Sequence, residues 1–503
     1  MNKKFILLIA FLIALLAVLV LRRAWMSDDA YITLRVIDNF RNGYGLTWNI
    51  AERVQVYTHP LWMMLEVLVI SITNDYYLIP IFLGFGFTLL AVTWIFAKLA
   101  QSSQAAVLAG LALCLSNAFV DYATSGLENP LSHVLIGVFF TIFLTAPSFH
   151  RHIGRLSLVA ALGMLTRIDL GLVFLPALLI AFFQVRSWKA LIRLLAGMIP
   201  LLIWEGFSLV YYGSLLPNTA YAKLYGGYPT IEYLQRGLNY YEYSLKFDPV
   251  TILIIFTGLI LPLFIRGGRI KMLSASSLAY LGYILWIGGD FMGGRFFTIP
   301  FYLGIIALLQ IKQEFLKFRY TAVGVSLLMI MGLILTPEPV YTLGSLSMSG
   351  RKSEFYKGIA DERQFYFPGT SLMNYRRDIP YPSYPWMDEG RKDRRGSRTV
   401  IVNATGGMRC FAGGPRIHYV DHLGITDPFL ARLPAVKKDN WRVGHLERAI
   451  PAGYLESIST GRNLLQDPHL AQSYDRIKLI TQGDLFDPER MKVIVQQTFG
   501  LTP

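Results

Sequence analysis

The chain has 503 residues, of which 53% are hydrophobic and 16% are charged, and its mean hydropathy is +0.43. This composition is too apolar for an ordinary soluble protein and indicates a multi-pass membrane protein. The net charge of +14 suits loops that face anionic lipid and phosphorylated substrates, and binding to nucleic acid is not expected. The two cysteines, Cys114 and Cys410, lie far apart, which excludes a disulfide framework and a cysteine-based metal site.

The chain opens with an apolar segment. Lys3 and Lys4 precede an apolar run that ends at Leu21, and Arg22 and Arg23 follow it in place of a small-residue cleavage site. We therefore predict an uncleaved first span whose amino terminus lies in the cytoplasm. The two arginines go against the charge rule for the outer side, which indicates that they have another use.

Further apolar runs predict a helical bundle of about 11 spans by the length rule. The runs cover residues 61–97, 105–119, 131–146, 156–165, 170–183, 191–212, 250–265, 273–287, 296–311 and 320–335. Asn74 and Asp75 divide the first run into two spans, or into an interfacial helix and one span. Basic loops at 150–155, 186–193, 266–271 and 312–319 are expected in the cytoplasm, so the polar loops that alternate with them are expected outside.

From about Glu338 onward the chain is polar and contains no run able to span a bilayer. Short apolar alternations at residues 399–402 and 418–420, set among turns and short helices, predict a small α/β domain. An odd number of spans places this domain outside the cytoplasm. We therefore predict a transmembrane domain over residues 1–337 and an extracytoplasmic domain over residues 338–503.

The stretch from Ser27 to Pro60 follows the first predicted span and carries groups suited to sugar transfer. Asp28 and Asp29 stand side by side at its start. A carboxylate beside a reacting centre takes a proton from the incoming hydroxyl, which is worth roughly 10²–10⁴-fold in rate. These two residues are the predicted catalytic groups, and a solvated, salt-bridged loop is the alternative.

Cationic side chains near the predicted outer surface are candidates for binding the phosphate of a lipid-linked donor. They are Arg22, Arg35, His59, Lys223 and Arg295. A helix-capping role is equally open for His59. The alternative for Lys223 is a snorkelling anchor, and the alternative for Arg295 is a helix-terminus ion pair with Asp290.

Polar and aromatic residues of the predicted outer loops and tail are candidates for binding the sugar or the acceptor: Trp48, Glu128, Asn218, Asp290, Asp421 and His422. Glu128 is equally suited to the start of the following helix, and a tryptophan such as Trp48 is common in an interfacial belt. Arg167 and Asp169, two residues apart, are predicted to pair with each other. No metal-ligand spacing is evident, so a divalent cation is left open as the only cofactor.

Several segments of the chain resemble the GT-C superfamily of polyprenyl-phosphate-sugar glycosyltransferases. More narrowly, the chain resembles the AftB-type terminal arabinofuranosyltransferases of mycobacteria and the TfpW-type pilin arabinosyltransferases. The segments are DDAYITLR (28–35), GYGLTWNIAERVQVYTHPLW (43–62), SGLENPL (125–131), LTRIDLG (165–171), LPNTAYAK (216–223), GGDFMGGRFF (288–297), VDHLGITDPFLARLP (420–434) and WRVGHLERAIPAGY (441–454).

The resemblance implies an enzyme that transfers a D-arabinofuranosyl residue from a polyprenyl-phosphate donor to an arabinan, another cell-envelope glycan or a pilin-like protein. It implies a bacterial inner-membrane protein with its active site on the outer side, where Asp28 and Asp29 hold the position of the GT-C catalytic acids. A GT-C transferase that uses another polyprenyl-phosphate pentose or hexose is the main alternative. A transporter of lipid or sugar is a remote one, since carriers place ionisable residues near the membrane midplane.

Overall fold

The computed structural model describes residues 3–224, 226–350, 355–404, 406–498 and 500. The chain divides into two compact units, each built from separate stretches of sequence. The first unit contains Met1–Ser27, Tyr77–Leu201 and Thr230–Ile379, and the second contains Asp28–Tyr76, Leu202–Pro229 and Pro380–Pro503. The domain boundary expected after residue 337 is inferred from composition and differs from the division into these two compact units. It stays a prediction.

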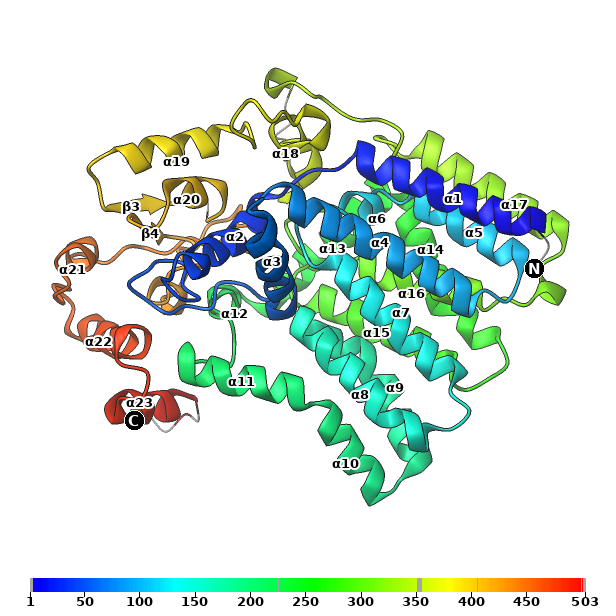
Figure 1. The fold of residues 1–503 in the computed structure, drawn as a ribbon, viewed down its shortest axis with the longest axis horizontal. Coiled ribbons are helices and arrows are strands. Elements are labelled where there is room, and N and C mark those ends of the chain that lie inside the picture. The colour runs from blue at the N-terminus through cyan, green and yellow to red at the C-terminus, as the bar shows by residue number, and fades with distance from the viewer. Residues whose placement is uncertain (1–2, 225, 351–354, 405, 499, 501–503) are drawn as a thin grey trace. The chain divides into compact units, whose positions relative to one another are not determined.

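The first unit is almost entirely helical (Figure 1). Two short strands, β1 (Phe355–Tyr356) and β2 (Ile359–Ala360), form an antiparallel pair. The helices are α1 (Lys3–Arg22), α4 (Leu78–Leu99), α5 (Ser103–Leu115), α6 (Asn117–Asp121), α7 (Asn129–Thr145), α8 (Phe149–Thr166), α9 (Gly171–Val185), α10 (Trp188–Gly197), α13 (Thr230–Phe247), α14 (Pro249–Phe264), α15 (Lys271–Trp286), α16 (Thr298–Leu309), α17 (Phe318–Ile330) and α18 (Glu362–Thr370), with short helical turns at Ile168–Leu170, Gln313–Phe315, Met331–Leu335, Met348–Gly350 and Leu372–Asn374.

Helix α16 is the centre of the first unit. All of its residues from Thr298 to Leu309 are buried, and it packs against α4, α5, α7, α14 and α15. A helix that is apolar on every side is stable only where other helices cover it. Its contact with α14 is very close, because a Cβ on Gly304 would lie 2.3 Å from the carbonyl oxygen of Ile254.

Two helices among the described residues, Leu78–Leu99 and Ile168–Val185, are long and apolar enough to cross a membrane. Two bent pairs, α10 with α11 (Ile199–Tyr211; 51°) and α13 with α14 (114°), raise this number to four if each pair counts as one span. Shorter apolar helices accompany them, and leucine and phenylalanine side chains lie exposed along these helices. The chain is therefore a multi-pass helical membrane protein, whereas the count of about 11 spans stays a prediction. The run 61–97 is divided at Asn74, which takes a left-handed conformation after α3.

The second unit combines helices with a small sheet. Strands β3 (Val400–Asn403) and β4 (His418–Asp421) pair in parallel, with Val400 opposite His418 (Figure 1). These are the two strands expected from the apolar alternation of the tail. The helices are α2 (Asp28–Arg41), α3 (Pro60–Thr73), the greater part of α11 (Ile199–Tyr211), α12 (Asn218–Leu224), α19 (Pro385–Arg395), α20 (Met408–Gly413), α21 (Tyr454–Thr460), α22 (Pro468–Gln482) and α23 (Pro488–Thr498), with a turn at Leu430–Arg432.

The close contact of α14 with α16 gives a first prediction. Gly304→Ala is expected to destabilise the protein by about 1–3 kcal/mol, because the added methyl group has to push two helix backbones apart. Thermal unfolding in detergent measures the effect. Gly282→Ala on α15 is the control, since a Cβ there meets no atom within 4 Å. Equal unfolding temperatures for the two variants would contradict the described packing.

Candidate active site

Asp28 begins α2 and is buried within the second unit. Its Oδ1 atom accepts a 2.7 Å hydrogen bond from the backbone N–H of Met408 at the start of α20. Residue 407, which precedes Met408, has to be glycine, because a Cβ on Gly407 would lie 2.5 Å from the carboxyl carbon of Asp28. Burial, assisted by the nearby charge of Asp29, raises the pKa of Asp28 to about 7.

Asp29 occupies the next position in the first turn of α2 but is only partly buried. Two adjacent residues of a helix point about 100° apart around its axis, so the two carboxyl groups have different surroundings. The positive end of the helix dipole favours both carboxylates. One enclosed and one accessible carboxyl group therefore stand side by side.

Arg35 and Trp48 lie inside the second unit. The guanidinium of Arg35 donates to the carbonyl oxygens of Trp48 (2.8 Å), Ile417 (3.0 Å) and Cys410, and lies 4.7 Å from the centre of the Trp48 ring. Trp48 itself is 1% exposed and also contacts the ring of Tyr419. Arg35, predicted to bind phosphate, and Trp48, predicted to bind the sugar, thus both connect the α2 region to the segment 410–419 in this structure.

His59 and Asn218 also contact protein groups. The Nε2 atom of His59 lies 2.9 Å from the hydroxyl of Thr33, and the His59 side chain makes no capping hydrogen bond to α3. The side-chain amide of Asn218 donates to the carbonyl oxygens of Gly424 (2.9 Å) and Asp427 (3.2 Å). Asn218 therefore anchors the tail segment that follows β4 to the start of α12.

Asp421 ends β4 and accepts hydrogen bonds from the backbone N–H groups of Leu423 (2.9 Å) and Thr426 (3.0 Å). It shapes the turn that follows. The neighbouring His422 is only half-buried. Two of the predicted phosphate ligands are exposed: Lys223 near the end of α12 and, in the first unit, Arg22 at the end of α1.

The second unit also holds two further buried carboxyl groups, Glu52 and Asp427. Glu52 lines a cavity of about 150 Å³ together with His418 and Tyr454, and Tyr454 donates to Asp427 (2.8 Å). Burial, reinforced by the charge of Asp427, raises the pKa of Glu52. Burial lowers the pKa of His418 to about 4, so its imidazole is neutral at pH 7 and forms no ion pair with Glu52.

In the first unit, the predicted residues Glu128, Arg167, Asp169 and Arg295 form one buried network. Glu128 is 0% exposed and accepts hydrogen bonds from Arg167 (2.8 Å) and Arg295 (3.0 Å). Arg167 also binds Asp169 through two hydrogen bonds of 3.0 and 2.6 Å, so the predicted pair is confirmed. Asp290 lies 3.9 Å from Arg295. The network ties together the starts of α7, α9 and α16.

The contacts of Arg23 explain why an arginine stands directly after the first apolar helix. It is buried and binds both carboxyl oxygens of Asp121, at 2.7 and 2.8 Å. Arg363 approaches the same carboxylate at 3.2 Å. The sequence signalled a special use for Arg22 and Arg23, but the partner, 98 positions away from Arg23, left no spacing signal.

Metal ligation has no evident site within the described part of the chain. Among the described residues, no group of three or more His, Cys, Asp or Glu side chains is placed to hold one ion. The divalent cation that the sequence left open therefore has no candidate ligand set among these residues.

Comparison with curated proteins finds two relatives. The chain is 26% identical over 418 residues to the terminal beta-(1->2)-arabinofuranosyltransferase of Mycobacterium tuberculosis, covering 73% of this chain and 66% of that protein. It is 27% identical over 325 residues to the protein of the same name from Corynebacterium glutamicum, covering 56% and 47%. The matches thus span less than two thirds of either relative. Their names confirm the predicted resemblance to arabinofuranosyltransferases, which are glycosyltransferases.

No family model matches the chain. Among solved structures, ArnT of Cupriavidus metallidurans in the apo state aligns with a TM-score of 0.47 and 12% identity, covering 82% of this chain and 85% of that one. The mycobacterial arabinofuranosyltransferase AftD aligns with a TM-score of 0.34 and 12% identity, covering 92% and 33%.

The buried Glu52 carboxyl gives a prediction for pH dependence. Because folding raises the pKa of Glu52, the native state binds more protons than the unfolded chain at pH values above the ordinary carboxyl pKa. The free energy of unfolding therefore falls as pH rises from about 5 to about 8. Glu52→Gln is expected to make this fall shallower. Thermal unfolding across that pH range measures it, with Glu489→Gln, whose side chain is 62% exposed, as the control. Parallel pH profiles for wild type and Glu52→Gln would contradict the expectation.

Proposed function

We propose that this chain is a membrane glycosyltransferase that transfers a D-arabinofuranosyl residue from a polyprenyl-phosphate donor to an extracytoplasmic arabinan, cell-envelope glycan or pilin-like protein. The observation that carries the proposal is the similarity over 418 residues to a protein named for terminal arabinofuranosyl transfer. The aligned stretch covers 73% of this chain. Asp28 and Asp29 at the start of α2 supply the carboxyl groups that such a transfer uses as a base or a nucleophile.

In the proposed reaction the acceptor hydroxyl forms a bond to the anomeric carbon of the donor, and the bond from that carbon to the phosphate oxygen breaks. Asp28 takes the hydroxyl proton, and its pKa of about 7 suits a group that accepts and releases a proton near neutral pH. Such a single displacement inverts the anomeric centre. If Asp29, the more accessible of the two, attacks first as a nucleophile, two displacements retain the configuration.

Lys223 and Arg295 are the proposed ligands of the donor phosphate. Lys223 is exposed near the end of α12, and the guanidinium of Arg295 is held in place by Glu128. A guanidinium binds a phosphate through two parallel hydrogen bonds, and an ammonium acts as a point charge. Arg35 and His59, which contact protein groups, are assigned to positioning α2.

The enzyme is proposed to work on the outer face of the bacterial inner membrane. The basic loops at 150–155, 186–193, 266–271 and 312–319 belong on the cytoplasmic side by the charge rule, and the loops that carry Glu128 and Asp290 alternate with them. The acidic pair and the polar tail then face the acceptor.

The proposed catalysis is tested with purified, detergent-solubilised protein, synthetic polyprenyl-phosphoryl-arabinofuranose and a panel of arabinoside and peptide acceptors. Asp28→Asn and Asp29→Asn are each expected to lower transfer by roughly 10²–10⁴-fold, while Asp38→Asn on the same helix retains it. NMR of the product anomer separates base from nucleophile. Transfer that survives both changes would remove the acidic pair from the mechanism, and turnover of a hexosyl donor alone would replace the sugar.

The phosphate ligands are tested through the donor KM. Lys223→Gln and Arg295→Gln are each expected to raise it about tenfold or more, because each loses one charge-assisted interaction. Lys492→Gln, an exposed charge on α23, is the matched control. A donor KM that stays at the wild-type value would exclude the substituted residue from the phosphate site.

The sidedness is tested by a reporter fused after residue 498, at the end of α23. A periplasm-active phosphatase is expected to be active there, because the tail is placed outside. A second fusion in the basic loop at 266–271 is the control and is expected to be active only as a cytoplasmic reporter. Cytoplasmic activity of the first fusion would reverse the topology.

A further inference from the structure

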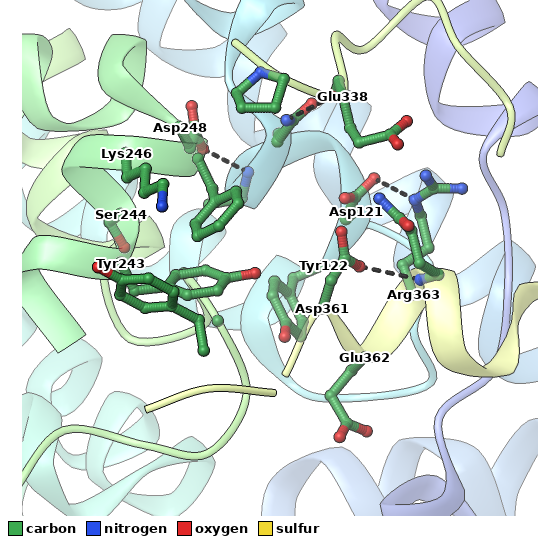
Figure 2. Close-up of a pocket in the computed structure, with 18 of the residues that line it drawn as sticks. Asp121, Tyr122, Tyr243, Ser244, Lys246, Asp248, Glu338, Asp361, Glu362 and Arg363 are labelled. Atoms are coloured by element: carbon green, nitrogen blue, oxygen red, sulfur yellow. Dashed lines mark hydrogen bonds and ion pairs between the residues drawn. The ribbon is translucent and has the colours of Figure 1, made fainter. Parts of the chain in front are cut away.

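The first unit contains a cavity of about 380 Å³ that no step of the proposed reaction uses (Figure 2). Five separate segments line it: the end of α6, the bend between α13 and α14, the Gly293–Gly294 turn, residues 337–338, and residues 355–364 up to the start of α18. Its volume falls within the range of small-molecule sites, roughly 300–1,000 Å³.

The lining combines hydrogen-bonding groups with aromatic rings. In Figure 2, Tyr243, Ser244 and Lys246 approach from one side and Arg363 and Glu362 from the other. Its carboxylates are Asp121, Asp248, Glu338, Asp361 and Glu362, its cations are Lys246 and Arg363, and its rings are Tyr122, Tyr243, Phe247, Phe355 and Tyr356. The excess of carboxylates repels a phosphate and attracts hydroxyl donors.

Several buried polar atoms of this lining, Asn117 Oδ1 among them, have no hydrogen-bond partner among the described residues, and two of them are donors on almost fully buried side chains. These two donors are the hydroxyl of Ser244 and the Nη2 atom of Arg363, and both side chains are 1% exposed. Arg363 is fixed by its other nitrogens, which contact the carbonyl of Leu343 (2.9 Å) and Asp121 (3.2 Å). Because a desolvated donor without a partner is costly, these groups indicate that a ligand supplies oxygen atoms at this place.

We infer that this cavity binds a neutral oligosaccharide segment of the acceptor glycan. Sugar hydroxyls donate to the carboxylates and accept from Ser244 and Arg363, and the apolar face of a sugar ring packs against the aromatic side chains. The lining segments at 117–122, 293–294, 337–338 and 355–364 all belong to the predicted outer side, where such a glycan lies. That the bound sugar is an acceptor rests on the proposed function; that the cavity binds a neutral glycan does not.

The test is direct binding of a synthetic neutral tetra-arabinofuranoside to the full detergent-solubilised chain by calorimetry, with no donor present. Ser244→Ala is expected to weaken binding about tenfold, the loss of one hydrogen bond. Ser277→Ala on α15 is a closely matched control, because this serine is also buried, also lacks a hydrogen-bond partner among the described residues, and does not line the cavity. It is expected to bind as the wild type does.

Asp361→Asn is a second variant that keeps the fold. Asparagine also accepts the capping hydrogen bond from the Gln364 N–H (2.9 Å), so the cap is kept while the negative charge beside the cavity and Arg363 is lost, and weaker binding is again expected. Equal affinity of the wild type and both cavity variants, or no binding by a protein that transfers to the same glycan, would overturn the inference. Binding that is sensitive to Ser244→Ala in a protein with no transferase activity would uphold the cavity and refute the proposed function. Absence of both binding and transfer would refute both.

Discussion

The free-energy cost of burying charge organises this protein. Glu128 has no exposed surface, and an isolated carboxylate in that position would be strongly destabilising. Two guanidinium groups, from Arg167 and Arg295, compensate it, and they come from chain segments that are far apart in the sequence. Apolar contacts are tolerant of sliding, whereas a hydrogen-bonded ion network fixes the relative positions of the segments that contribute to it. The start of α7, the turn before α9 and the loop before α16 are therefore held in one arrangement.

The same constraint acts on the second unit with a different result. There, Arg35 is surrounded by backbone carbonyl oxygens and aromatic rings and so completes the packing of α2. Asp28 accepts backbone hydrogen bonds from Met408 and Gly407, which offset only part of the effect of burial, so its pKa rises to about 7. The charge of Arg35, which is fully hydrogen-bonded, stabilises the fold. The carboxyl group of Asp28, whose charge is only partly compensated, can exchange a proton near neutral pH.

A transferase that joins a lipid-linked sugar to a glycan needs sites of opposite preference, one for an anionic phosphate and one for neutral hydroxyl groups. The proposed phosphate ligands are cationic, whereas the cavity beside α6 and α18 is lined by more carboxylates than cations. This contrast keeps the two substrates from competing for one place. In the inferred glycan site, the buried hydroxyl of Ser244 favours an oxygen-rich ligand over a lipid chain.

The sequence by itself determined the features that rest on local pattern: the apolar helices, the break at Asn74, strands β3 and β4, the Arg167–Asp169 pair and the resemblance to arabinofuranosyltransferases. Periodicity and short spacings are sufficient for these, because the residues concerned are neighbours in the chain. The tertiary structure alone decided that Trp48 is enclosed and that Arg23 binds Asp121. It also decided that Glu52 lies near Asp427 and that five distant segments form one cavity. Such contacts depend on which helix faces meet, and residue type and order do not encode that in any short window.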